Sequence, residues 1–100
     1  GGPVIATTPF GRRFGANLAH HRRRAGLTQE DLSDLAALHR TAVGQLERGE
    51  RVPRADTLLK LATSLRIDSA RLLDGIVWTP PRLDTGSFGL EEVDGPLGSG

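Results

Sequence analysis

Residues 29–48 read QEDLSDLAALHRTAVGQLER, and the spacing of the apolar side chains in this stretch predicts two short helices that cross steeply. Ser33 has to be small, because the second helix passes over it at close range. The residues that would face the core shared by the two helices are Leu32, Ala36, Val43 and Leu46. This arrangement leaves the outer face of the second helix free.

The free face of this second helix carries side chains suited to nucleic acid. They can donate hydrogen bonds to base edges and phosphates, and no acid among them would repel DNA. The outward residues would be Arg40, Thr41, Gly44, Gln45 and Arg48. A helical hairpin with a solvated face is the alternative interpretation, because helix pairs joined by a short turn are common in all-α domains.

The residues before this stretch predict a further helix. It begins at Arg12, after a segment rich in glycine and proline, residues 1–11, that we expect to form a flexible arm. Phe14 and Leu18 lie about one turn apart on this helix, and Gly26 follows at a position typical of a helix end.

Capping residues mark the ends of the two central helices. Thr28 can cap the second helix, with Asp31 three residues later completing an acidic form of the capping box. This helix is expected to run to about Ala36, and the third helix, about nine residues long, stops at Gly49.

Two more helices are predicted after the loop that follows Gly49. Asp68 or Ser69 caps a short fifth helix, which Gly75 ends. The fourth helix is marked by Leu58, Leu61, Ala62 and Leu65. The expected fold is therefore all-α, a compact five-helix bundle over residues 12–75.

The remaining residues, 76–100, lack a helical period. Pro80 and Pro81 and a rising content of glycine and acid interrupt any helix, so we expect an extended or disordered tail without internal strand pairing. Packing against the bundle is expected only from Ile76, Val77 and Trp78.

The composition excludes several classes of function. The chain has 100 residues, the length of one domain, and it contains no cysteine, which excludes disulfides, thiolate metal sites and cysteine nucleophiles. No apolar run approaches the roughly 20 residues of a membrane span, so we expect a soluble, cytoplasmic protein with no membrane partner.

The adjacent His20 and His21 diverge on a helix and predict no metal site. Without any catalytic motif, the chain is predicted to be no enzyme and to need no cofactor.

The net charge of +1 conceals a division along the chain. Residues 11–54 carry nine arginines against five acids, a net +4, whereas residues 68–100 carry two arginines against six acids, a net −4. An arginine-rich half suits bidentate contacts to phosphate or guanine. A codon bias toward arginine would give the same count.

Several short motifs together resemble the helix-turn-helix family of phage repressors and Cro, also known as the xenobiotic-response-element family. The resemblance covers residues 14–75. It rests on Phe14-Gly15, Leu18, Arg22, Gly26-Leu27-Thr28-Gln29-Glu30-Asp31-Leu32, Val43-Gly44-Gln45-Leu46-Glu47-Arg48-Gly49, Pro53, Thr57-Leu58-Leu59-Lys60-Leu61-Ala62 and Leu72-Leu73. It implies a five-helix DNA-binding domain that acts in transcription regulation as a homodimer on an inverted repeat.

The resemblance also implies roles for individual residues. Gln29 would contact the DNA backbone at the start of the second helix, and Glu47 would form an internal ion pair with Arg22. Ala42 and Gly44 would allow close approach to DNA. The base-reading positions are Arg40, Thr41 and Gln45, and the positions that contact the backbone or the minor groove are Arg48, Arg51 and Arg54.

Three residues depart from the family pattern. His21 takes the place of a core leucine and is expected to be partly buried and uncharged. His39 stands where the family has a serine or threonine helix cap, and Ala37 replaces a turn glycine. If position 37 needs a left-handed conformation, alanine costs about 1 kcal/mol there.

The function predicted from these observations is sequence-specific binding of double-stranded DNA. The third helix would read an inverted-repeat operator in the major groove, and the chain would act as a bacterial or phage repressor. One alternative is an antitoxin or immunity component that binds a partner protein through its acidic tail, which contains Asp84 and residues 91–94. Another is an adaptor that binds protein and has lost affinity for DNA.

Overall fold

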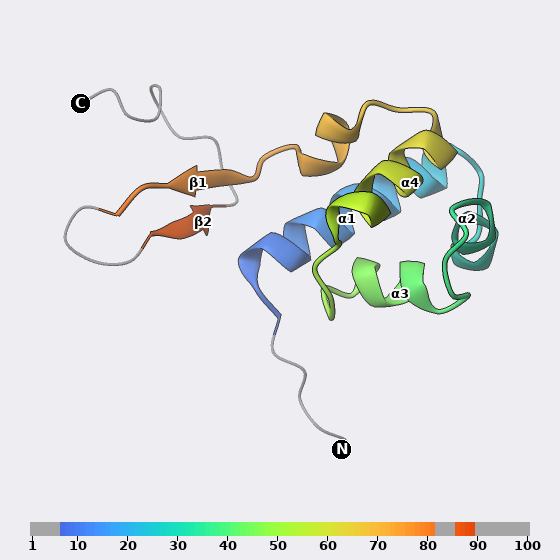
Figure 1. Ribbon diagram of the computed structural model, residues 1–100, viewed down its shortest axis with the longest axis horizontal. Helices are drawn as coiled ribbons and strands as arrows, with labels where there is room; N and C mark the ends of the chain where they lie inside the picture. Colours follow the sequence, from blue (N-terminus) through green and yellow to red (C-terminus); the bar gives the residue numbers. More distant parts are fainter. Residues whose placement is uncertain (1–6, 82–85, 90–100) are drawn as a thin grey trace, which may run out of the picture.

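The computed structural model describes residues 7–81 and 86–89 (Figure 1). The helices are α1 (Pro9–Arg24), α2 (Gln29–Leu35), α3 (Ala42–Glu47) and α4 (Ala55–Leu65), followed by a 3-10 helix, η1 (Ser69–Leu73). Two short strands, β1 (Val77–Thr79) and β2 (Ser87–Gly89), complete the described fold. Within the described residues, no helix is long and apolar enough to cross a lipid bilayer.

Helix α1 begins earlier than the sequence analysis expected. Its first residue is Pro9, and the hydroxyl of Thr8 caps it by accepting a hydrogen bond from the Gly11 amide at 2.9 Å. Proline is favoured in a first helical turn because its fixed φ suits a helix and its missing N–H would have no partner there. The expected arm over residues 1–11 is therefore wrong for residues 9–11, while residues 1–6 lie outside the described part.

The capping box predicted for α2 is present. The amide of Asp31 donates to the Thr28 hydroxyl at 3.0 Å, and the amide of Thr28 donates to the Asp31 carboxylate at 3.2 Å. The turn after α2 contains Ala37 in the left-handed conformation, with a φ of 56°. This is the conformation in which an alanine side chain is strained.

Helix α3 has six residues, fewer than the nine expected. Residues 39–42 form a turn before it, closed by a 2.9 Å hydrogen bond from the Ala42 amide to the His39 carbonyl. The Thr41 amide donates to Nδ1 of His39 at 3.2 Å. His39 thus satisfies one backbone N–H before α3 without capping the helix itself.

The hydrophobic core lies where the four helices and η1 meet. Phe14 and Leu18 of α1 are fully buried, as are Leu32 and Val43, the pair predicted between α2 and α3. The other core residues are Ala36, Leu46, Leu61, Ala62, Leu65 and Leu72. The core predicted from the spacing of apolar residues is confirmed at each of these positions.

The expected fifth helix is a 3-10 helix, so the five-helix count is not confirmed. Its cap is Asp68, whose carboxylate accepts a hydrogen bond from the Ala70 amide at 3.0 Å. The side-chain amide of Asn17 on α1 donates to the carbonyls of Leu72 and Asp74, at 3.0 and 2.9 Å. These contacts hold η1 against α1.

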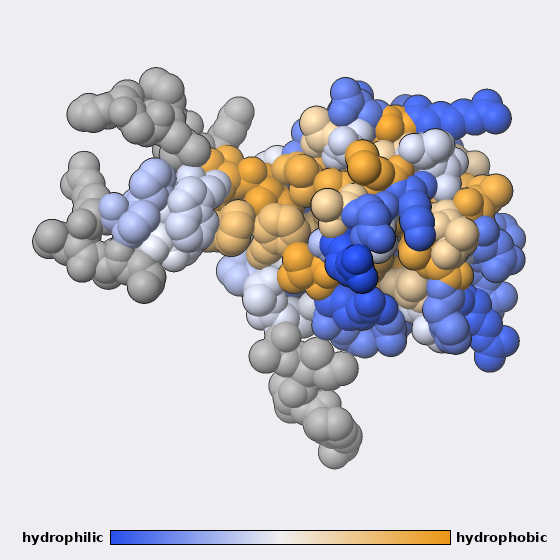
Figure 2. All heavy atoms as spheres, viewed as in Figure 1, coloured by the Kyte–Doolittle hydropathy of each residue, from blue (hydrophilic) through white to orange (hydrophobic). Residues whose placement is uncertain are grey.

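The prediction of an unpaired tail is wrong. Strands β1 and β2 form an antiparallel pair in which Trp78 lies opposite Phe88. Trp78 packs on Phe88, with ring centroids 4.9 Å apart, and Phe88 packs edge-on against Phe10 of α1 at 5.1 Å. Trp78 therefore packs within the hairpin, and Ile76 packs against the hydrophobic core as expected. Figure 2 shows apolar surface where the hairpin meets the bundle.

Candidate nucleic-acid interface

Helix α3 is fixed by its buried side. Val43 and Leu46 are in the core, and the hydroxyl of Ser33 on α2 accepts a hydrogen bond from the Val43 amide at 3.3 Å. Ser33 is fully buried, as the sequence analysis required, and it also satisfies a backbone donor in the first turn of α3. The orientation of α3 on the bundle is thereby set from α2.

The opposite side of α3 and the turn before it carry three of the predicted base-reading residues. Arg40 and Thr41 are exposed, and Gln45 is half-buried. Arg40 takes part in no hydrogen bond or ion pair with another described residue. Thr41 lies against His39, with its hydroxyl oxygen 2.8 Å from Nδ1.

Two residues of the predicted interface are buried. Ala42 is 6% exposed, and its side chain lies beside the loop between α3 and α4. The close approach to DNA expected at Ala42 stays a prediction. Gly44 is buried beneath the side chains of Arg48 and Gln29: a Cβ at Gly44 would lie 3.1 Å from Nη1 of Arg48 and from Oε1 of Gln29. Gly44 therefore still lies on the side of α3 that carries Arg48 and Gln29, and the side chains of these two residues cover it.

The expected ion pair between Arg22 and Glu47 is present. Nε of Arg22 lies 2.6 Å from Oε2 of Glu47, and Nη2 lies 3.0 Å from Oε1. The hydrogen-bonded carboxylate of Glu47 raises the pKa of Arg22. Arg22 also donates to the Leu27 carbonyl at 2.9 Å, which fixes the turn between α1 and α2.

Gln29 belongs to the same network. Its side-chain amide donates to Oε1 of Glu47 at 2.9 Å. The backbone N–H groups at the start of α2 are separate from this contact, so the position remains compatible with the phosphate contact that the resemblance implies. The Gln29 side chain itself is oriented by Glu47.

The three predicted backbone-contacting arginines each have a partner within the chain. Arg48 is paired with Glu50, and the hydrogen bond to that carboxylate raises the pKa of Arg48. Arg54 lies 3.4 Å from Asp56, and Arg51 donates to Oε1 of Gln45 at 3.2 Å. All three arginines are exposed, so phosphate oxygens can compete with these partners.

Sequence reasoning missed Glu50 and Asp56. Each lies two residues after the arginine that it contacts, a spacing that places no two side chains together on a regular helix. It also missed the reason for Gly15. A Cβ at Gly15 would lie 2.5 Å from the carbonyl oxygens of Leu46 and Glu47, so α1 and the end of α3 touch backbone to backbone.

His21, next to Arg22, has a lowered pKa. Burial lowers the pKa of His21, and the charges of His20 and Arg71 lower it further, against a smaller opposing effect of Asp74. His21 is half-buried, which agrees with the expectation that it is partly buried. Among the described residues, no three histidine, aspartate or glutamate side chains lie together in a way that could hold a metal ion.

Comparisons with known proteins agree with this geometry. Residues 13–74 match the model of a family described as a helix-turn-helix domain. The control protein C.SmaI of Serratia marcescens is 39% identical over 57 residues, which cover 57% of this chain and 68% of that protein. An uncharacterized HTH-type transcriptional regulator of Sinorhizobium fredii, y4dJ, is 36% identical over 66 residues, which cover 66% and 86% of the two chains.

A solved structure gives the same result. The restriction-modification controller protein C.AhdI from Aeromonas hydrophila superposes with a TM-score of 0.61 and 42% identity, covering 62% of this chain and 94% of that one. The family model spans residues 13–74, which include α2, the turn after it and α3. This chain therefore belongs to the helix-turn-helix domain family, of the type found in phage repressors and xenobiotic-response-element regulators.

Proposed function

We propose that this chain is a transcription regulator that binds double-stranded DNA sequence-specifically, with α3 in the major groove. The observation that carries the proposal is the arrangement of α3: its apolar side is locked in the core, and Arg40, Thr41 and Gln45 lie on the solvent side. The names of three relatives, a control protein, a controller protein and a transcriptional regulator, support a regulatory role.

The base-reading roles follow from the chemistry of these side chains. Arginine can bridge O6 and N7 of guanine, glutamine can pair with adenine, and the methyl group of threonine can contact thymine. Arg40 has no competing partner among the described residues, so it is the best candidate for a specific base contact. Gln45 has to break its hydrogen bond with Arg51 before its side-chain oxygen can contact a base edge.

Phosphate contacts would flank the reading helix. Arg48, Arg51 and Arg54 lie at the end of α3 and in the loop after it, and the first turn of α2 begins at Gln29. Phosphate contacts fix the position of a protein on DNA without reading its sequence. Glu50 and Asp56 would weaken these contacts. Arg48 has to give up its ion pair with Glu50, and Arg54 its ion pair with Asp56, before either arginine can bind a phosphate.

We further propose that two copies bind an inverted repeat and that binding represses transcription. A helix of six residues, Ala42–Glu47, reaches only a few base pairs, and a second copy doubles the length of sequence that is read. Two-fold symmetric dimers place their reading helices about one helical turn apart, roughly 34–36 Å.

The experiment that tests the proposed function is a selection of random duplex DNA on the purified chain at near-physiological salt. Enrichment of an inverted repeat, with half-sites about one helical turn apart, is the expected result. If a dimer contacts roughly 6–10 phosphates, its affinity falls by about three to five decades between 50 and 200 mM salt. A folded protein that enriches no sequence would contradict the proposal.

One observation favours a second function, binding of a partner protein. Trp78 and Phe88 are 43% and 45% exposed on the hairpin, and aromatic side chains of this kind are enriched at protein interfaces. The acidic residues of the proposed tail contact, Asp84 and residues 91–94, lie outside the described residues. The absence of any enriched DNA sequence, together with a co-purifying protein, would support an antitoxin or adaptor.

A further inference from the structure

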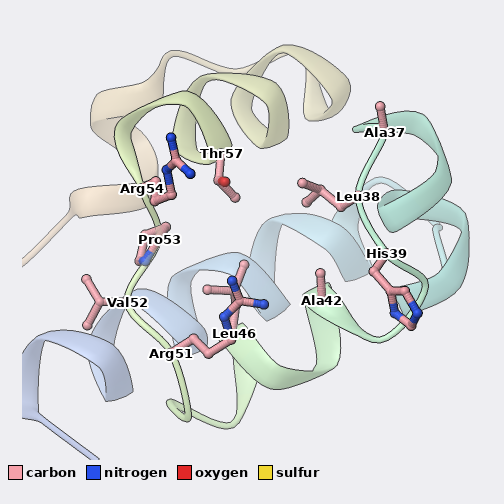
Figure 3. A pocket seen from close by; sticks show the side chains of 10 residues that line it. All are labelled: Ala37, Leu38, His39, Ala42, Leu46, Arg51, Val52, Pro53, Arg54 and Thr57. Atoms are coloured by element: carbon pink, nitrogen blue, oxygen red, sulfur yellow. The ribbon is translucent and has the colours of Figure 1, made fainter.

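A hollow separates α3 from the first turn of α4. Its volume is about 280 Å³, and it opens between the turn after α2 and the loop after α3 (Figure 3). The floor is aliphatic: Leu46 and Ala42 line it from α3, Leu38 from the turn, and Val52 from the loop. We refer to it as the α3–α4 hollow.

The outer part of this apolar lining is open to solvent, whereas Ala42 and Leu46 are 6% and 3% exposed. Val52 is 52% exposed although it is β-branched and apolar, and Leu38 is only half-buried. Small-molecule sites typically combine such an apolar lining with a few convergent polar groups, in volumes of about 300–1,000 Å³. The α3–α4 hollow is slightly smaller than this range and would fit a ligand with about one ring.

Two positively charged side chains stand among the polar groups at its rim. Arg51 and Arg54 border the hollow together with the hydroxyl of Thr57, and none of its lining residues is acidic. Arg51 has a neutral partner, Gln45, and the pair of Arg54 with Asp56 is exposed on both sides. A guanidinium has five donors, so a carboxylate can bind either arginine.

The hollow is connected to the reading face of α3. Ala42 and Leu46, which line it, are each one residue after Thr41 and Gln45, so the two surfaces are about 100° apart around the helix. Arg51 joins them directly, because its Nη1 donates to Oε1 of Gln45 at 3.2 Å. A carboxylate that binds Nη1 of Arg51 would compete with this bond and place a negative charge beside the phosphate-contacting arginines.

We propose that the α3–α4 hollow binds a small apolar carboxylate, and that the bound carboxylate competes with DNA for Arg51 and Arg54. The competition rests on the proposed function, whereas the binding of the carboxylate does not. The ligand is thus an effector of the regulator, and its apolar group lies on Leu46, Ala42 and Val52.

The test is a titration of the full chain with benzoate, followed by the backbone amide signals in the absence of DNA. Saturable shifts are expected at Leu38, Ala42, Val52 and Thr57. Benzyl alcohol, which has a similar ring and no charge, should bind about tenfold more weakly, because it lacks a charge-assisted hydrogen bond to arginine. Equal binding of the two compounds, or no saturation by benzoate, would overturn the proposal.

Two substitutions locate the site. Ala42→Leu projects a larger side chain into the hollow and should abolish the benzoate shifts, whereas Ala70→Leu, at an exposed position of η1, should leave them unchanged. Arg51→Gln should weaken benzoate about tenfold, from the loss of one charge-assisted bond. If Ala42→Leu is folded and still gives the same shifts, benzoate binds elsewhere and the proposal is wrong.

A third variant and a DNA measurement separate the remaining outcomes. Replacing Glu91, Glu92 and Asp94 by their amides should leave the unliganded signals of the hollow unchanged; if they move, the acidic segment of the chain itself is the occupant and the proposal is overturned. Benzoate should weaken the binding of the unchanged chain to the selected duplex. It should have no effect on the binding of the Ala42→Leu variant to the same duplex. A chain that binds benzoate but no DNA would contradict the proposed function alone.

Discussion

Arg22 holds Glu47 at two points, with Nε 2.6 Å from Oε2 and Nη2 3.0 Å from Oε1. The side chain of Arg22 is 12% exposed and that of Glu47 is 6% exposed, so little of the pair is accessible to water. Gln29 donates to the same carboxylate, and contacts from α1, α2 and α3 therefore converge on one residue. An acid at the end of the proposed reading helix is thus a structural residue that orients the interface.

Removing the acid from this pair should strongly destabilise the fold. We expect Glu47→Ala to lower the free energy of unfolding by about 3 kcal/mol, because it leaves the Arg22 charge nearly buried without its partner. Urea denaturation followed by circular dichroism measures this change.

A matched control separates burial from pairing. Asp56→Ala breaks the exposed pair with Arg54, which is 82% exposed, and should change the stability by less than about 1 kcal/mol. The double variant Arg22→Met/Glu47→Leu should recover much of the loss, since no charge is left buried. Similar losses in Glu47→Ala and Asp56→Ala would contradict this account of the network.

Glycine at position 37 should stabilise the protein. Ala37 has a φ of 56°, where a Cβ costs about 1 kcal/mol, so Ala37→Gly is expected to raise the free energy of unfolding by up to that amount. Ala25, with a φ of −79° at the end of α1, is the control, and Ala25→Gly should give no gain. Thermal denaturation of both variants tests this, and a destabilised Ala37→Gly would show that the strain is absent.

Two glycines should respond in opposite ways to alanine. Gly15→Ala places a Cβ 2.5 Å from two backbone oxygens of α3 and should destabilise by about 1–3 kcal/mol. Gly44→Ala meets only the ends of the flexible Arg48 and Gln29 side chains, and it should gain up to about 1 kcal/mol of helix propensity. Comparable denaturation midpoints for the two variants would contradict the close contact of α1 with α3.

His21 should make the fold less stable in mild acid. Burial and the charges of His20 and Arg71 lower the pKa of His21 in the folded state. The unfolded chain therefore binds a proton first, and stability is lost as the pH falls from the unfolded value of about 6.5 through the lower folded value. Denaturation midpoints at pH 7.5 and 5.5 measure the difference. It should shrink in His21→Gln, and a difference of the same size in that variant would exclude His21 as its source.

The helical core could be predicted from the sequence because its residues follow helical spacing. The positions of Leu32 and Val43, and the small Ser33 between the two helices, each follow from local spacing and close packing. The start of α1 was missed because Pro9 was interpreted as a loop residue, although proline is favoured in a first turn that Thr8 caps.

The hairpin and the inner face of α3 could not be predicted in this way. Trp78 and Phe88 are ten residues apart, on strands too short to show an alternating pattern, and Phe88 also packs against Phe10 of α1. The burial of Ala42 depends on the loop after α3. Both are tertiary contacts for which the local sequence carries no period.

The most direct test of the central claim, that α3 and the turn before it read DNA, compares two arginines on a selected duplex and on a scrambled one. Arg40→Ala should weaken binding to the selected duplex by about 1–3 kcal/mol, relax one base position and barely affect the scrambled duplex. Arg54→Ala should weaken both duplexes alike, as the loss of a phosphate contact does. An equal loss on both duplexes for Arg40→Ala would contradict the assignment of α3 and the turn before it as the reading surface.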